Sequence, residues 1–358
     1  MAIEIRIEEV DERRSKPEDN SLKFGDVFTD HMFVMNFEKS RGWYDPRIMP
    51  FGPLSISPAA AAFHYGQTIF EGLKAYRTED DRALLFRPRD NARRLNASAS
   101  RLCMPEMEED IFVDAIRALV DFERDWIPKG EGTSLYIRPV MFATEEHLAL
   151  KPSARYTFAI ILSPVGSYYP RGLAPTKILV ESQQVRSVPG GVGAAKTGGN
   201  YARCLEAEVN ASEMGYDQVL WLDGREREYV EEVGAMNVFF RFGDTIVTPP
   251  LTGTILPGIT RNSVLTLLED WGVPTKERRI PLSEVLEAHG DGTLEEAFGA
   301  GTAAVISPIG QLRCGDRDLA INSGSMGEMT ARLYETLTGI QRGQIEDRFG
   351  WTVEVSGD

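Results

Sequence analysis

Apolar and polar positions follow two different periods along the chain, and these periods predict its strands and helices. In the first half, apolar residues at every second position indicate strands, and apolar residues three or four apart indicate helices. The expected strands cover residues 24–37, 134–142 and 156–162, with a hairpin from His64 to Phe86. The expected helices cover residues 59–64, 88–101 and 110–124. We interpret residues 43–54, which contain three prolines, as a loop.

The second half continues this mixture of elements without a repeated sequence unit. Strand-like runs occur at 178–181, 218–222, 235–242 and 245–248. Helix-like runs occur at 202–214, 260–271, 282–289 and 326–338. Strands and helices that are mixed without a self-similar period predict α/β layers rather than a solenoid.

The length of the chain bounds its domain organisation. A chain of 358 residues, 42% of them hydrophobic, is long enough for two domains with separate cores. The polar segment 1–21 is expected to be a mobile lead, and residues 22–163 to form a small α/β domain. Residues 164–176 are rich in proline, glycine and tyrosine, which is typical of a connector between domains. Residues 177–358 then form the larger α/β domain.

Charge and cysteine content exclude several classes of protein. The formal net charge of −15 argues against nucleic acid or an anionic membrane as the main partner, because both bind basic surfaces. Cys103, Cys204 and Cys314 are widely spaced, so neither a disulfide framework nor a zinc site is indicated. The sequence has no apolar signal core and no apolar run long enough to span a membrane. We therefore expect a cytoplasmic protein without a membrane segment.

A single lysine, Lys196, lies within a run of small residues between Gly190 and Tyr201. The run comes within one residue of a phosphate-binding loop, but Ala195 replaces the second glycine and no helix begins at the lysine. A lysine among small neighbours can instead lose its proton and form a Schiff base with a flat cofactor that lies against the backbone. An ordinary lysine on a flexible surface loop is the alternative, and these residues alone leave it open.

Two acidic residues and two glycine-containing loops are further candidates for a binding site. Glu232 could keep a pyridine nitrogen protonated, whereas a solvated acidic turn is the alternative for Glu232 and the favoured interpretation of Glu231. The loop 252–261 leads into a helix whose free N–H groups could bind a phosphate, or it is simply a capping loop. Residues 298–304 form either another such turn or a tightly packed strand.

Arginine side chains could bind the anionic groups of a ligand. Arg94 could contact the same phosphate, although a surface arginine on a helix is the default interpretation. Tyr136 and Arg138 point to the same face of one strand, where they could bind a carboxylate together or simply form a pair at a sheet edge. None of the four histidines is spaced from another as metal ligands are, so we expect no metal site.

Taken together, these stretches resemble the branched-chain amino acid aminotransferases, which are pyridoxal-phosphate enzymes of fold type IV. The resemblance runs from Phe24 to the C-terminal helix and keeps the order of the family's signature blocks. These blocks match residues 24–32, 65–77, 136–139, 190–201, 232–237 and 256–261. The resemblance implies a two-domain α/β (mixed α+β) fold with the cofactor between the domains, and a homodimer.

The resemblance also implies a role for each candidate residue. Lys196 would hold pyridoxal 5'-phosphate as a Schiff base and move a proton between the substrate α-carbon and C4′ of the cofactor. The other cofactor contacts would be Tyr201 to the phenolic oxygen, Glu232 to the ring nitrogen, Leu256 on the ring, and Arg94, Ile259, Thr260 and Thr302 to the phosphate. The substrate contacts would be the apolar walls Phe24, Tyr65, Phe70 and Tyr168, the carboxylate-binding Tyr136 and Arg138, and the backbone of Ala235 and Ala303.

The implied reaction is a reversible transfer of the amino group of L-leucine, L-isoleucine or L-valine to 2-oxoglutarate, by ping-pong kinetics. The chain departs from the family at two places. Mammalian relatives carry a CxxC redox switch where this chain has Ala304 and Ser307, and some relatives have a threonine where it has Ala235. The alternatives are a D-amino acid aminotransferase or an aminodeoxychorismate-lyase-like enzyme of the same fold type, a pyridoxal-phosphate binding protein without catalysis, and a nucleotide-binding module.

Overall fold

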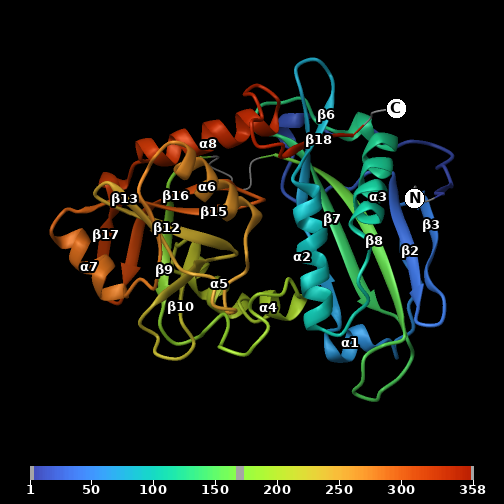
Figure 1. Ribbon diagram of the computed structural model, residues 1–358, viewed down its shortest axis with the longest axis horizontal. Helices are drawn as coiled ribbons and strands as arrows, with labels where there is room; N and C mark the ends of the chain where they lie inside the picture. Colours follow the sequence, from blue (N-terminus) through green and yellow to red (C-terminus); the bar gives the residue numbers. More distant parts are fainter. Residues whose placement is uncertain (1–3, 167–172, 356–358) are drawn as a thin grey trace. The chain divides into compact units, whose positions relative to one another are not determined.

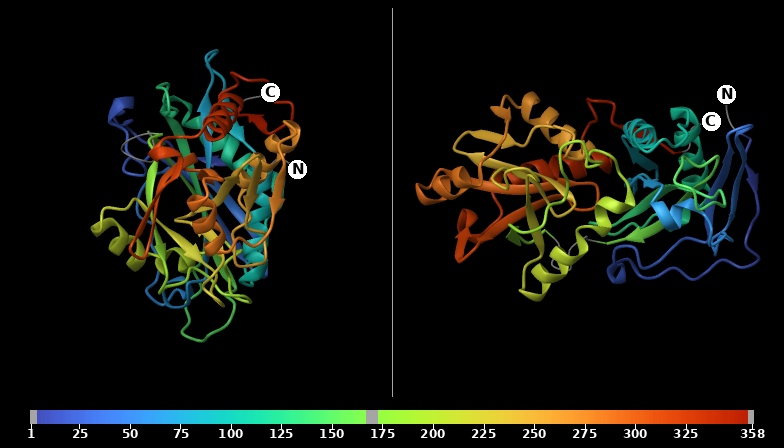
Figure 2. Two further views of the ribbon diagram at one scale, coloured as in Figure 1. Left: turned by 90° about the vertical axis from the view of Figure 1, so that its left-hand side faces the viewer. Right: turned by 90° about the horizontal axis from the view of Figure 1, so that it is seen from below.

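The structure is a computed structural model in which residues 4–166 and 173–355 are described. The chain forms two compact units, each built around its own sheet (Figures 1 and 2). Unit 1 contains Met1–Tyr168, Ala195–Gly198 and Gly339–Asp358, and unit 2 contains Tyr169–Ala194 and Gly199–Thr338. Two segments of the predicted larger domain, 177–358, therefore belong to unit 1, and one of them carries Lys196.

The sheet of unit 1 has nine strands within the described residues. Its order is β1 (Arg6–Ile7), β3 (Gly42–Pro50), β2 (His31–Glu38), β8 (Arg155–Val165), β7 (Ser134–Ala143), β5 (Leu73–Arg77), β6 (Ala83–Phe86) and β18 (Thr352–Glu354), and β4 (Thr68–Phe70) also pairs with β7. All neighbours are antiparallel except β1 and β3. The last strand brings the C-terminal segment back beside β6, where Trp351 packs edge-on against Phe86.

Helices cover one face of this sheet and form the core of unit 1 with it. Its helical elements are η1 (Asp19–Ser21), α1 (Ala61–Tyr65), α2 (Pro88–Arg101), α3 (Glu109–Phe122) and η2 (Arg124–Trp126). Helices α2 and α3 lie beside β7 and β8 (Figure 1) and bury one apolar stripe each against alternate residues of the strands. Leu95 of α2 and Ile116 of α3 share this core with Ile137 of β7 and Phe158 of β8. The opposite face carries a smaller apolar cluster around Val34 and Ala159.

The sheet of unit 2 also has nine strands within the described residues. Its order is β11 (Val230–Val233), β10 (Gln218–Leu222), β9 (Thr176–Glu181), β16 (Val305–Cys314), β15 (Leu294–Gly301), β12 (Met236–Phe242), β13 (Thr245–Thr248) and β14 (Thr275–Glu277), and β17 (Arg317–Ala320) pairs with β16. An additional pairing of β11 with β12 closes six of these strands into a ring. The second apolar core, which includes Val180, Val238 and Phe240, is formed largely by these strands.

The remaining helical elements are α4 (Gly198–Ala202), α5 (Leu205–Glu213), α6 (Ile259–Asp270), α7 (Leu282–Gly290), η3 (Ile321–Gly324) and α8 (Glu328–Gln341). Helix α5 covers most of the predicted helix 202–214, and a separate short helix, α4, begins at Gly198 within the lysine run. Among the described residues, no helix is long and apolar enough to cross a membrane.

Three sequence predictions about local structure were wrong. Residues 42–50 form strand β3 and not a loop, because Pro46 lies at a bulge where the pairing of β2 and β3 shifts register and Asp45 has a positive φ of 54°. Strand β2 begins at His31 and not at Phe24. Glu231 and Glu232 are both buried on strand β11, so the favoured interpretation of Glu231 as part of a solvated turn was wrong.

Candidate active site

The backbone N–H and the backbone carbonyl of Lys196 each form a hydrogen bond within unit 1. Its N–H donates to Oγ of Ser98 at 2.9 Å, and its carbonyl accepts from the N–H of Phe70 at 3.0 Å. The next residue, Thr197, forms a β-bridge with Ile69 and donates its hydroxyl to the carbonyl of Thr68. The lysine run is therefore not a flexible surface loop, because its centre is fixed against β4 and α2.

The surroundings of the Lys196 side chain lower the pKa of its amine. Its Nζ lies 4.7 Å from the centre of the Phe70 ring. Burial and then the positive charge of Arg94 lower the pKa of Lys196 from 10.5 to about 8, with a smaller contribution from Arg138, and Glu71 and Tyr136 oppose this shift. A lysine with a pKa near 8 is partly neutral near physiological pH, which is what an attacking amine requires.

Arg94 is buried and not on the surface, and it forms a two-pronged ion pair with Glu71. Its Nε donates to Oε1 of Glu71 at 2.8 Å, and its Nη2 donates to Oε2 at 2.7 Å. Asn91 adds a third hydrogen bond to the same carboxylate at 2.8 Å. Burial raises the pKa of Glu71, but Arg94 and, less strongly, Lys196 and Asn91 outweigh burial and hold that pKa below its usual value. The carboxylate is thus ionised and orients the guanidinium.

The structure brings four predicted substrate residues together in unit 1. Arg138 donates from Nη2 to the hydroxyl of Tyr136 at 2.7 Å, and its guanidinium carbon lies 4.7 Å from the centre of the Phe70 ring. The ring of Phe24 packs edge-on against that of Tyr136 with 4.8 Å between centroids. Since Phe70 also contacts Lys196, these aromatic and cationic groups form one cluster around the lysine.

The other two predicted substrate side chains are not placed in this cluster by the contacts just described. Tyr65 lies on α1, is 41% exposed and donates its hydroxyl to the carbonyl of Leu148. Tyr168 lies outside the described residues.

In unit 2, Glu232 is buried on β11, where Arg186 and Asn237 are among its neighbours. Nη1 of Arg186 lies 2.7 Å from its Oε2, and Nδ2 of Asn237 lies 3.3 Å from its Oε1. Asn237 also donates to the carbonyl of Leu256 at 3.0 Å. The predicted acid is therefore fixed next to the predicted ring-packing residue, which is itself 8% exposed.

The predicted phosphate residues of unit 2 occupy a helix start and a turn. Ile259 and Thr260 open helix α6, whose N-cap is Gly258 and has no side-chain cap. A Cβ atom added to Gly258 would lie 2.0 Å from Oδ1 of Asn237, so only glycine allows this close approach. Thr302 and Ala303 follow strand β15 in a turn.

The structure also places Tyr201, Ala235 and the glycine-containing stretch 298–304. Tyr201 lies in α4, and Ala235 lies in the turn between β11 and β12. Gly299 lies inside β15, where an added Cβ would be 2.8 Å from Met236. The stretch 298–304 is thus mostly a tightly packed strand end, the second of its two sequence interpretations.

Sequence reasoning missed the residues that hold the predicted ones in place. Glu71 lies within one quoted signature block and Arg186 shortly before another, but nothing in a linear sequence pairs them with Arg94 and Glu232. A charged residue next to apolar strand residues, such as Glu71 after Thr68–Phe70, is the signal that could have marked a buried ion pair. Asn237 carries a similar signal, because it is a polar residue within an apolar strand.

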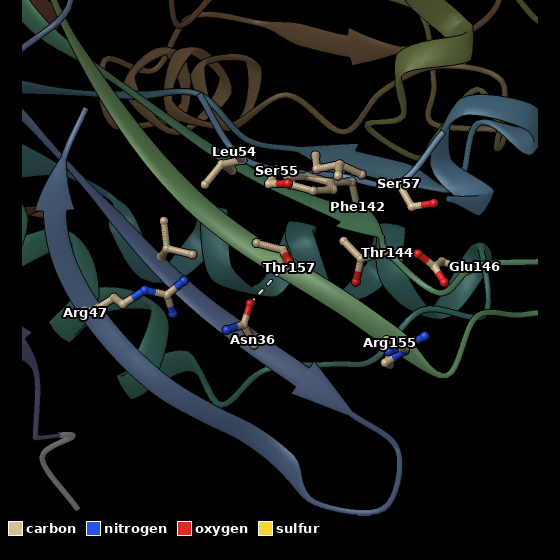
Figure 3. Close-up of a pocket in the computed structure, with 12 residues that line it drawn as sticks. Asn36, Arg47, Leu54, Ser55, Ser57, Phe142, Thr144, Glu146, Arg155 and Thr157 are labelled. Carbon is tan, nitrogen blue, oxygen red and sulfur yellow. Dashed lines mark hydrogen bonds between the residues drawn. The ribbon is translucent and has the colours of Figure 1, made fainter. Parts of the chain in front are cut away.

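A cavity of about 360 Å³ lies on the sheet face of unit 1 that carries Val34, and none of the predicted site residues lines it (Figure 3). Its lining comes from β2, β3, β7, β8 and the loops beside them: Val34, Asn36, Arg47, Leu54, Ser55, Ile56, Ser57, Phe142, Thr144, Glu146, Arg155 and Thr157. The hydroxyl of Thr157 donates to Oδ1 of Asn36 at 3.3 Å. This cavity is therefore a different feature from the Lys196 cluster.

Comparison with known proteins links the chain to aminotransferases. The sequence model of the family described as "Amino-transferase class IV" matches residues 68–312. Branched-chain-amino-acid aminotransferase 2 of Bacillus subtilis (strain 168) is 57% identical over 352 residues, which cover 98% of this chain and 97% of that protein.

Solved structures agree with this result. A branched-chain aminotransferase from the archaeon Thermoproteus uzoniensis, with norvaline, matches with a TM-score of 0.76 and 27% identity, covering 91% of this chain and 100% of that one. The T.th. branched-chain amino acid aminotransferase with pyridoxamine 5'-phosphate matches with a TM-score of 0.75 and 26% identity, covering 90% of this chain and 98% of that one.

Proposed function

The chain belongs to the class IV aminotransferases, and we propose from this that it transfers the amino group of L-leucine, L-isoleucine or L-valine to 2-oxoglutarate, reversibly and by ping-pong kinetics. The predicted family, fold type and class of enzyme are confirmed. The names of the most similar relatives support this function over the D-amino acid and lyase alternatives. The single observation that carries the proposal is the Lys196 amine, whose pKa lies near 8 beside Arg94.

Pyridoxal 5'-phosphate is the proposed cofactor, and the donor set fits it. The cofactor requires an amine for its aldehyde, an acid for its ring nitrogen and cationic or N–H donors for its phosphate. Lys196, the buried Glu232 and Arg94 supply these groups, together with the uncapped start of α6. Gly258 lies too close to Asn237 to carry a side chain, so only backbone groups are present at the N-cap of that helix.

The chemistry that the cofactor supplies when bound is an electron sink for the bond between the substrate α-carbon and its hydrogen. The protein's own contribution is to place its groups around it. Lys196 would hold the aldehyde carbon and then carry the proton at Nζ, because its neutral form is a base near neutral pH. Glu232 would keep the ring nitrogen protonated, and Tyr201 would donate to the phenolic oxygen. Leu256 would exclude water from one ring face.

The phosphate and the substrate would use the remaining residues. Arg94, the N–H groups of Ile259 and Thr260 and the hydroxyl of Thr302 would bind the phosphate. Phe24, Phe70, Tyr65 and Tyr168 would form apolar walls for branched side chains. Tyr136 and Arg138 would bind the second carboxylate of glutamate, and the backbone at Ala235 and Ala303 would bind the α-carboxylate. An aromatic wall beside one arginine suits both an apolar and an acidic side chain.

We also propose a homodimer that works in the cytoplasm. Apolar side chains of unit 1 are exposed on two segments that lie side by side, because the N–H of His147 bonds to the carbonyl of Ala59 and Tyr65 bonds to Leu148. The exposed residues are Phe63, Tyr65, Leu148 and Leu150, with exposures of 62%, 41%, 68% and 83%. Such a patch favours contact with a second copy. Sedimentation of wild type and Leu150→Asp tests this, since an unchanged dimer in the variant would remove Leu150 from the interface.

The experiment that tests the reaction is the visible absorbance of purified protein with pyridoxal 5'-phosphate, recorded before and after L-leucine. We expect cofactor absorbance that depends on Lys196 and that L-leucine discharges. Discharge by D-alanine but not L-leucine would support the D-amino acid alternative. Absorbance that no amino acid discharges would support a binding protein without catalysis. The same absorbance in Lys196→Ala would contradict the role of the lysine.

A further inference from the structure

Arg186 lies in direct contact with Glu232, and both side chains are buried. Its Nη1 lies 2.7 Å from Oε2 of Glu232, and the two side chains are only 7% and 3% exposed. Arg186 and Glu232 therefore form a buried ion pair.

The position of Arg186 is set by backbone and not by Glu232 alone. Its Nη1 donates to the carbonyl of Thr254 at 2.9 Å, and its Nη2 lies 3.4 Å from the carbonyl of Gly193. One guanidinium therefore contacts three segments: the strand with Glu232, the loop before Leu256 and the run that leads to Lys196. Gly193 is required at this point, because an added Cβ would lie 2.2 Å from the carbonyl oxygen of Thr254.

A second buried acid, Glu231, lies close enough to Arg186 to interact with its charge. Glu231 is also buried, and burial raises its pKa, with Asp223 adding to that shift and Thr254 and Arg186 opposing it. Thr254 donates its hydroxyl to Oε1 of Glu231. Arg186 is in ion-pair contact with Glu232, whereas Glu231 accepts the hydroxyl of Thr254, so the direct partner of this guanidinium is Glu232.

We propose that Arg186 is a positioning residue that keeps Glu232 ionised and aimed at the ring nitrogen of the cofactor. The proposal rests on the proposed function, in which Glu232 holds that nitrogen protonated. Arg186 acts only through Glu232 and does not touch the substrate. Its loss would therefore have the same effect on turnover as removal of the charge of Glu232.

A double-mutant cycle tests this proposal, with Arg186→Met, Glu232→Gln and the double variant. We expect each single variant to lower kcat by on the order of 10- to 100-fold, the range seen for groups that orient metal ligands. The double variant should be no slower than Glu232→Gln alone, because Arg186 has nothing left to act on. Arg186→Lys keeps a cation at the carboxylate and should recover most of kcat. The cofactor absorbance should persist in all four variants, because Lys196 is unchanged.

The stability of the protein without cofactor gives a second readout. Arg186→Met leaves a buried carboxylate without its cation, so it should lower the midpoint of urea unfolding at neutral pH, and the double variant should regain most of it. Losses in kcat that multiply in the double variant, or a wild-type kcat in Arg186→Met, would overturn the proposal. A wild-type protein that never binds pyridoxal 5'-phosphate would overturn the proposed function instead, while the urea cycle would still measure the Arg186–Glu232 pair.

Discussion

The amine of Lys196 should react at a pH where ordinary lysines are protonated. Its pKa is about 8, against 10.5 for an exposed lysine. At pH 7.5 roughly one quarter of Lys196 side chains would then be neutral, compared with about one in a thousand ordinary lysines. The expected advantage in attack on an aldehyde is therefore about two orders of magnitude.

The assay is imine formation by the cofactor-free protein with pyridoxal, which lacks the phosphate and so separates amine reactivity from phosphate binding. Subtracting the rate of Lys196→Ala removes the contribution of other lysines. We expect the remaining rate to rise with pH and to level off above about pH 8. A rate that keeps rising through pH 10 would show an ordinary lysine and refute the reasoning.

Two variants test whether nearby charge causes the shift. Arg94 lowers the pKa of Lys196 and Glu71 raises it. Arg94→Met should therefore move the midpoint of the pH–rate curve upward, and Glu71→Gln should move it downward. Tyr136 and Arg138 also face the amine and are unchanged in both variants. Shifts in the same direction for both variants would indicate structural damage rather than an electrostatic effect.

Three further predictions concern specificity, stability and cofactor binding. Arg138→Ala should raise KM for glutamate by roughly 10- to 100-fold through loss of charged hydrogen bonds, and equal losses for leucine would contradict the second-carboxylate role. Lys74 is 7% exposed, and burial and then Arg342 lower its pKa from 10.5 to about 7. The unfolded chain therefore binds more protons than the folded one between about pH 7 and 10.5, so the folded state gains stability as pH rises through this window. Lys74→Met should remove this pH dependence and raise the free energy of unfolding at pH 6.5 by up to ~5 kcal/mol, measured by urea unfolding. A difference in stability between variant and wild type that does not change with pH would argue against a lowered pKa of Lys74. Gly258→Ala should displace Asn237 and weaken pyridoxal 5'-phosphate binding roughly 5- to 10-fold, measured by fluorescence titration. An unchanged Kd would show that the contact of Gly258 with Asn237 does not matter for cofactor binding.

Features that depend on neighbours in the chain were predictable. Helix α2 runs from Pro88 to Arg101 as expected, because proline suits the first helical turn and its apolar residues repeat at helical spacing. Strands β10 and β13 also have the expected bounds, 218–222 and 245–248. The lone lysine among glycines was visible in the same way, since local sequence alone makes it unusual.

Features that depend on pairing across the chain were not predictable. Residues 42–50 look like a loop because of their prolines, and only the antiparallel partner β2 and a bulge at Asp45–Pro46 make them a strand. The segment Ala195–Gly198 belongs to unit 1 because Lys196 and Thr197 pair with β4, more than a hundred residues earlier.

The sequence by itself determined which residue types were available for the chemistry: a lysine among small residues, an acid, arginines and a helix start. Only the tertiary structure decided which of these residues are buried and which charges lie next to them. A carboxylate or an amine changes its pKa through burial and through charges that folding brings near, and these neighbours are distant in sequence. Glu71 beside Arg94 and Arg186 beside Glu232 are such pairs. The residue types of the site could therefore be predicted from the local sequence, whereas the charges that surround each residue depend on the fold.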